Sequence, residues 1–171
     1  MRSIADVYRC DECEFAYDLT QASGSGAAIV EGAASIARAL RDTSIDVKSR
    51  RDANTWSPLE YGCHLRDVLL VQRERVLMAR REDCPSYPPM GRDERAEHDG
   101  YADQDPARVA EQLNDAALLF SNVLARLGSD DWQRTMIYNY PTPTERTMEW
   151  VALHTEHEIR HHLLDVNRQL S

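Results

Sequence analysis

Lysine is nearly absent from this chain of 171 residues, in which nineteen arginines accompany the single Lys48. The 20 basic side chains face 29 acidic ones, so the formal net charge is −9. Nucleic acids and anionic membranes both bind clustered basic residues, and the sequence therefore predicts neither partner. It also lacks an apolar run of about 18 residues that could span a membrane and a basic segment leading into an apolar one that would direct secretion. We expect a cytoplasmic protein.

Cysteine is present at only four positions: Cys10, Cys13, Cys63 and Cys84. In a reducing compartment these residues are expected to be thiols or metal ligands and not stable disulfides. Cys10 and Cys13 have the C-x-x-C spacing of a zinc knuckle. However, a second C-x-x-C is missing, and Glu14 stands where a knuckle has a glycine that can take positive φ. We therefore favour a redox pair or two unliganded thiols over a structural zinc site.

Helical periodicity runs through most of the chain, whereas strand alternation is almost absent. Helices are predicted over about 27–41, about 58–81, from about 106 to Gly128, and from a cap at Thr147 nearly to the carboxyl terminus. The second helix has the best-marked start, because Ser57-Pro58-Leu59-Glu60 forms a capping box with proline at the first helical position. The predicted fold class is all-α, a four-helix bundle.

We expect a single domain over residues 1–171, with residues 1–26 as an N-terminal extension that carries Cys10 and Cys13. A long connection, roughly 83–104, joins the second and third helices. It is polar and longer than an ordinary bundle turn, so it either covers a site or is partly mobile.

The last helix carries three histidines on its apolar face: His154, His157 and His161. The segment His157-Glu158-Ile159-Arg160-His161 matches H-E-x-x-H, in which histidines one turn apart bind zinc. Residues four apart can converge on one ion, whereas His154 and His161, seven apart, cannot. A zinc protease of this type takes its third metal ligand from a helix well downstream of the motif. Only ten residues follow His161, so a zinc protease is disfavoured. The extended protease motif also fails, with Leu164 at its glycine and Asn167 at its final histidine.

A third ligand must come from upstream, since a catalytic zinc ion has three protein ligands and one open position. His64 lies on the apolar face of the second helix, near its start. Metal sites in bundles are built from facing helices. We therefore predict that His64, His157 and His161 bind one divalent metal ion.

For the polar residues beside these histidines, the sequence gives less specific predictions. His154 is expected in the core, with a substrate contact or a hydrogen bond to a ligand left open. Glu158 lies about 100° around the helix from His157, which leaves its access to the site open. His162 is predicted to face solvent, and Cys63 to pack in the core. Asp67 could orient a neighbouring histidine or form an ion pair.

The segments WSPLEYGCHLRDVL and HEIRHHLLDV resemble the two metal-bearing motifs of the DinB-like, damage-inducible superfamily, especially its actinobacterial branch. CDECEFAYD is similar to a C-P-x-C-G-F-D-Y segment of some members, and YADQDPARVAEQL to the start of their third helix, so the resemblance covers nearly the whole chain. It implies a divalent metal, zinc or nickel, held by three histidines, here His64, His157 and His161. Relatives include S-transferases that use mycothiol or bacillithiol and a mycothiol-dependent maleylpyruvate isomerase, and relatives often dimerise.

This resemblance implies a metal-dependent S-transferase, active in detoxification, whose metal turns a low-molecular-weight thiol into a thiolate that attacks an electrophile. The expected partners are the small-molecule thiol and the electrophile, and a homodimer is possible. Two alternatives stay open. One is a thiol-dependent isomerase or specialised biosynthetic enzyme on the same scaffold, with His154, Tyr138, Tyr140 and Arg146 as the residues to inspect. The other is a metal-binding stress protein without turnover.

Overall fold

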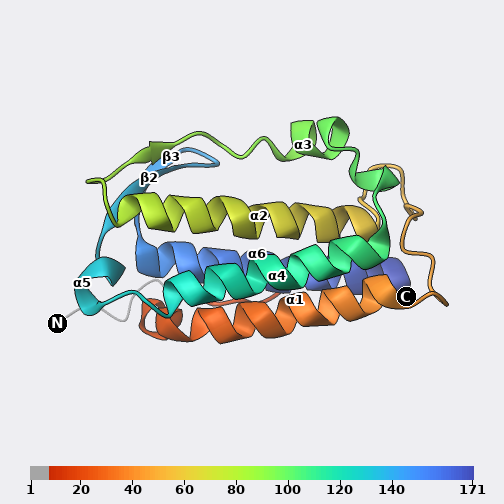
Figure 1. Ribbon diagram of the computed structural model, residues 1–171, viewed down its shortest axis with the longest axis horizontal. Helices are drawn as coiled ribbons and strands as arrows, with labels where there is room; N and C mark the ends of the chain where they lie inside the picture. Colours follow the sequence, from red (N-terminus) through yellow and green to blue (C-terminus); the bar gives the residue numbers. More distant parts are fainter. Residues whose placement is uncertain (1–7) are drawn as a thin grey trace.

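The bundle is formed by four long helices, seen side by side in the computed structural model, which describes residues 8–171 (Figure 1). These helices are α1 (Ser25–Arg41), α2 (Pro58–Ala79), α4 (Pro106–Leu124) and α6 (Met148–Leu170). Both α1 and α2 pack mainly against α4 and α6, so α1 and α2 lie at opposite corners of the bundle. In Figure 1, α1 and α6 run in one direction and α2 and α4 in the other. The predicted four-helix bundle is confirmed.

The helix starts follow from the local sequence. At α2, the Ser57 hydroxyl accepts from the Glu60 backbone N–H at 3.2 Å, and the Glu60 carboxylate accepts from the Ser57 N–H at 2.8 Å. Asp105 caps α4 through the backbone N–H of Arg108, and Thr147 caps α6. Each cap satisfies backbone donors that have no partner inside the first turn. The predicted helix starts agree with the structure to within two residues.

A small sheet at one end of the bundle was not predicted. Its strands are β1 (Ser86–Tyr87), β2 (Thr135–Asn139) and β3 (Pro143–Thr147). The β2–β3 pair is an antiparallel hairpin that pairs Thr135 with Thr147, and β1 lies parallel to β2. The expectation of a plain loop before α6 was therefore wrong. Met136 and Tyr138 alternate with less buried neighbours and fix the inner face of β2.

The long connection after α2 folds over that helix. It contains β1, helix α3 (Arg92–His98) and the 3-10 turn η2 (Tyr101–Asp103). Figure 1 shows α3 above α2, on the side away from α1. The remaining short elements are the 3-10 helix η1 (Leu19–Gly24) and α5 (Ser129–Trp132). Among the described residues, no helix is long and apolar enough to cross a membrane.

Candidate metal centre

A cavity of about 490 Å³ lies between α2, α6, β2 and the connection that covers α2. Its walls include both apolar and ionisable side chains. The lining residues that matter for chemistry are His64, Gln72, Arg75, Arg92, Tyr138, His154, Glu158 and His162. A cavity of this size accommodates a small-molecule ligand. The connection therefore covers a cavity, and the expectation that it covers a site stays a prediction.

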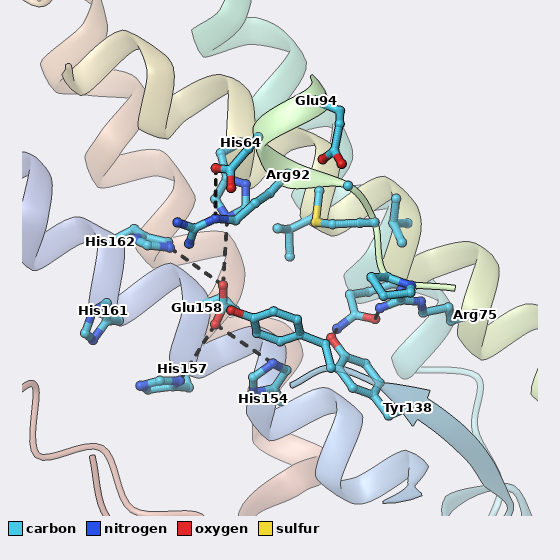
Figure 2. Close-up of a pocket in the computed structure, with 18 residues that line it drawn as sticks. His64, Arg75, Arg92, Glu94, Tyr138, His154, His157, Glu158, His161 and His162 are labelled. Atoms are coloured by element: carbon cyan, nitrogen blue, oxygen red, sulfur yellow. Dashed lines mark hydrogen bonds and ion pairs between the residues drawn. The ribbon is translucent and has the colours of Figure 1, made fainter. Parts of the chain in front are cut away.

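Three of these side chains form a cluster that we call the pocket cluster: His64, Glu158 and His162. The Oε2 atom of Glu158 lies 3.8 Å from Nε2 of His64 and 3.6 Å from Nε2 of His162. Both distances are too long for hydrogen bonds. They are close to the separation of about 3.4 Å between two nitrogen or oxygen ligands of a tetrahedral ion. In Figure 2 the dashed lines from the two imidazoles converge on the same end of the Glu158 carboxylate.

The helices fix the direction of each ligand. Glu158 and His162 are four residues apart on α6 and project from the same face toward α2. His64, 2% exposed, lies near the start of α2, where the capping box anchors the helix. The Nδ1 atom of His162 lies 2.9 Å from Oδ2 of Asp165. A carboxylate on the outer nitrogen orients a metal-binding histidine and leaves its other nitrogen for the ion.

The electrostatics of the pocket cluster favour a positive charge between the carboxylates. Burial opposes the ionised form of Glu158, but its contacts with His162 and His64 hold the pKa of this carboxyl well below its usual range. Burial also acts to lower the pKa of His162, yet Asp165 and Glu158 together raise it to about 9. A bound cation would take the place of the imidazolium charge. The donor set therefore fits a divalent ion.

The three histidines predicted to share an ion are distributed over two clusters. His64 belongs to the pocket cluster, whereas His157 and His161 form a second cluster with Cys10 and Cys13, which we call the turn cluster. Within residues 8–171, His64, His157 and His161 do not appear as a single group of close ligand atoms. Their common ion stays a prediction, and the geometry offers Glu158 and His162 as nearer partners of His64.

Several neighbouring residues can now be placed. The prediction that His162 faces solvent was wrong, because its ring packs between Tyr61 and His64. The signal for this position was the i, i+4 spacing of Glu158 and His162. His154 stacks on Trp150 with ring centroids 4.5 Å apart and lines the cavity. Cys63 is buried as predicted, and burial raises its thiol pKa to about 12.

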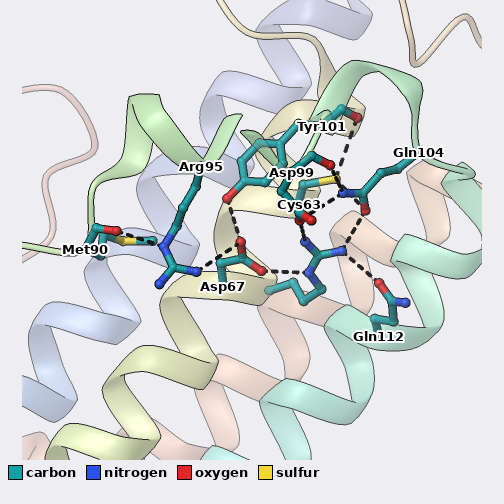
Figure 3. Close-up of polar contacts among 9 residues, drawn as sticks. Cys63, Asp67, Met90, Arg95, Asp99, Tyr101, Gln104 and Gln112 are labelled. Atoms are coloured by element: carbon teal, nitrogen blue, oxygen red, sulfur yellow. Dashed lines mark hydrogen bonds and ion pairs between the residues drawn. The ribbon is translucent and has the colours of Figure 1, made fainter. Parts of the chain in front are cut away.

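Asp67 anchors the covering connection and does not orient His64. Its carboxylate accepts from Nε of Arg66 at 2.8 Å and from the Tyr101 hydroxyl at 2.7 Å. Arg66 also donates to Asp99 and to Gln104 in the connection. Figure 3 shows this network between α2 and the segment above it. The connection is thus tied down at one end, while its other end borders the cavity.

Comparisons with known proteins identify the fold and the family of this chain. No curated protein matches the sequence. A solved structure of YfiT from Bacillus subtilis, described as a probable metal-dependent hydrolase with an unusual four-helix bundle topology, superposes with a TM-score of 0.72. The two chains share 18% identity, and the match covers 87% of each, which establishes the shared fold. The family model of the DinB superfamily matches residues 31–166, and this protein is a member of that superfamily.

Proposed function

We propose that this protein is a metal-dependent S-transferase that joins a low-molecular-weight, mycothiol-like thiol to an electrophile in the cytoplasm. The observation that carries the proposal is the convergence of His64, Glu158 and His162 at the wall of a cavity large enough for small molecules. Two imidazoles and one carboxylate leave a coordination position free, as in catalytic zinc sites. Zinc is the expected metal, with nickel as the other candidate.

A divalent ion at this site would lower the pKa of a thiol that binds to it and so supply a thiolate at neutral pH. The chain then needs no nucleophilic side chain of its own. Cys63, the cysteine on α2, is buried, and its raised pKa disfavours the thiolate. It therefore does not compete for this role.

The other cavity residues would orient the two substrates. Arg75 is held in place by its donation to the backbone oxygen of Pro88 at 2.9 Å and lies against the Tyr138 ring. Arg92 comes from α3 and stacks over Trp56 beside His64. These two guanidinium groups favour substrates that carry a carboxylate or another anionic group. The covering connection would limit access of water to the thiolate.

The test combines metal analysis with a thiol-transfer assay. The untagged protein is loaded with zinc or nickel, and consumption of mycothiol by a chromogenic electrophile is followed with and without enzyme. The proposal predicts metal-dependent transfer that is lost in His64→Ala and His162→Ala. Metal-loaded protein that leaves the uncatalysed rate unchanged with mycothiol, bacillithiol and glutathione would contradict it.

The same variants separate the two possible ligand sets. If the pocket cluster binds the metal, His162→Ala loses it, while His157→Ala retains it at the cavity. If instead the predicted set of His64, His157 and His161 is correct, His157→Ala loses the cavity metal and His162→Ala retains it. The metal content of His162→Ala therefore decides between them whatever the reaction is, because only the pocket cluster predicts a loss in that variant.

Hydrolysis is a second candidate, favoured by the ligand types. Two histidines and a glutamate are the zinc ligands of several hydrolases, in which the metal activates water. YfiT, with the same fold, is described as a probable metal-dependent hydrolase. A metal-dependent cleavage of ester or amide probes in the absence of any thiol would support hydrolysis over thiol transfer.

A further inference from the structure

The N-terminal segment brings two cysteines to the outer side of α6. The segment turns back on itself, with a β-bridge between Arg9 and Ala16 and a hydrogen bond from the Tyr17 N–H to the Tyr8 oxygen at 2.9 Å. Inside this turn, the N–H of Glu14 donates to the oxygen of Cys10 at 2.8 Å. The two cysteines of the turn belong to the turn cluster, together with His157 and His161.

The four ligand atoms of the turn cluster have spacings suited to one tetrahedral ion. The sulfur of Cys10 lies 3.7 Å from Nδ1 of His161, and all four ligand atoms lie within 4.8 Å of one another. With zinc bonds of about 2.3 Å to sulfur and about 2.1 Å to nitrogen, the edges of a tetrahedron measure about 3.4–3.8 Å. The Nε2 atom of His157 is buried without a hydrogen-bond partner, as expected of an atom that binds an ion.

The backbone after Cys13 has the conformation of a zinc knuckle although the glycine is missing. Glu14 takes a φ of 57°, a left-handed conformation that a side chain with a Cβ rarely adopts. The objection raised by Glu14 at the sequence level therefore fails, because the chain adopts the required turn with glutamate.

Neighbouring side chains support this arrangement. The Tyr17 hydroxyl lies 2.9 Å from Nδ1 of His157, which orients the imidazole and leaves Nε2 available for an ion. Phe15 packs near the His157 ring, with centroids 5.5 Å apart, and is 4% exposed. The site is thus shielded by apolar groups and braced by a hydrogen bond.

We propose that Cys10, Cys13, His157 and His161 bind a structural zinc ion that fastens the N-terminal segment to α6. Four protein ligands complete a tetrahedral shell, so this ion has no open position for a substrate. Two thiolates balance the charge of Zn²⁺, and the imidazoles bind as neutral groups. The site is separate from the pocket cluster, and it does not depend on the proposed transferase activity.

The test is metal stoichiometry together with cobalt substitution of the untagged full chain. We expect two zinc ions per chain, of which Cys10→Ser and Cys13→Ser each lose one. The cobalt form is expected to show near-ultraviolet sulfur-to-cobalt charge transfer, because thiolates are direct ligands. That absorption should disappear in Cys13→Ser and persist in two controls, Cys84→Ser and His162→Ala.

Two other outcomes overturn the proposal. A chain that binds one ion, lost in His162→Ala and retained in Cys13→Ser, would show that only the pocket binds metal and would leave the proposed function intact. An intact mass that indicates a Cys10–Cys13 disulfide in the protein as purified under reducing conditions would identify a redox pair. A Cys13→Ser variant that does not fold in zinc-free medium is replaced by His161→Asn, judged by the same cobalt absorption.

Discussion

Two faces of one helix carry two different kinds of candidate metal site. Glu158 and His162 on α6 group with His64, whereas His157 and His161, one residue earlier in each case, border the same cavity but group with Cys10 and Cys13. A shift of one residue on a helix turns a side chain by about 100°. The pocket cluster has three ligands and a cavity beside it, which suits chemistry. The turn cluster has four ligands and apolar cover, which suits a structural ion.

The largest expected effect is a loss of activity in a variant of the pocket cluster, set against a loss of stability in a variant of the turn cluster. His162→Ala removes a ligand of the pocket cluster, so thiol transfer should fall more than the roughly 100-fold typical of losing an outer partner of a ligand. Cys13→Ser should lower the thermal midpoint of unfolding and retain the pocket's metal. Elemental analysis and calorimetry of both variants check this pair. Equal loss of metal from both sites in either variant would show that the clusters are not independent.

The next effect concerns the connection that covers only the pocket cluster. Asp67→Ala leaves the buried guanidinium of Arg66 without its closest carboxylate and the Tyr101 hydroxyl without its acceptor. Removing one partner of such a pair costs about 3 kcal/mol. Urea denaturation should show this decrease in the free energy of unfolding. Glu97→Gln is the control, because Glu97 lies on the exposed side of α3 and its replacement should change the free energy of unfolding very little. The cobalt absorption of the turn cluster should stay unchanged in the folded variant.

A smaller effect is expected at the outer nitrogen of His162. Asp165→Asn weakens the carboxylate support of that imidazole, so metal affinity at the pocket cluster should fall about 10–100-fold. Arg168→Gln is a matched control, because Arg168 contacts the other oxygen of Asp165 without touching the ligands. Competition with a chelator measures the metal affinity of both variants. Equal affinities in Asp165→Asn and the native chain would indicate that His162 does not bind the ion.

The smallest effect lies on the turn cluster. Tyr17→Phe removes the hydroxyl that contacts His154 and His157 at 2.8 and 2.9 Å. The expected cost is about 1 kcal/mol, or about fivefold in zinc affinity at this site. Tyr8→Phe is the control, since Tyr8 is exposed and packs beside Tyr17. Zinc competition resolves a change of this size, and an equal change in both variants would contradict the assigned role.

The bundle could be predicted because its signals are local. The capping box at Ser57 and the Asp105-Pro106 start specify where helices begin, and the apolar spacing specifies their inner faces. The β2–β3 hairpin was missed although Met136 and Tyr138 alternate with more exposed neighbours. The two prolines that follow, Pro141 and Pro143, favoured a loop over a strand.

The metal ligands could be predicted only in part. The spacing of His157 and His161 predicts two side chains that converge, and their ligand atoms do lie in one close group. His64 borders the cavity, and its role as a metal ligand stays a prediction. Which partner each would meet depends on how α6 is rotated against α2 and on where residues 8–17 return. Neither is encoded in the spacing within one helix. Glu14 misled for a different reason, since tertiary contacts can hold a residue other than glycine in a left-handed turn.

The position of Tyr17 has one more consequence, for the tautomers of the histidines around it. Its hydroxyl carries one proton and lies between Nδ1 of His154 and Nδ1 of His157, so it donates to one ring and accepts from the other. If zinc binds Nε2 of His157, the Nδ1 of that ring keeps its proton and donates to Tyr17. Tyr17 must then donate to His154, whose own proton moves to Nε2, 3.9 Å from Glu158. The zinc ion of the turn cluster would thereby orient an N–H of His154 toward Glu158, a ligand of the pocket cluster.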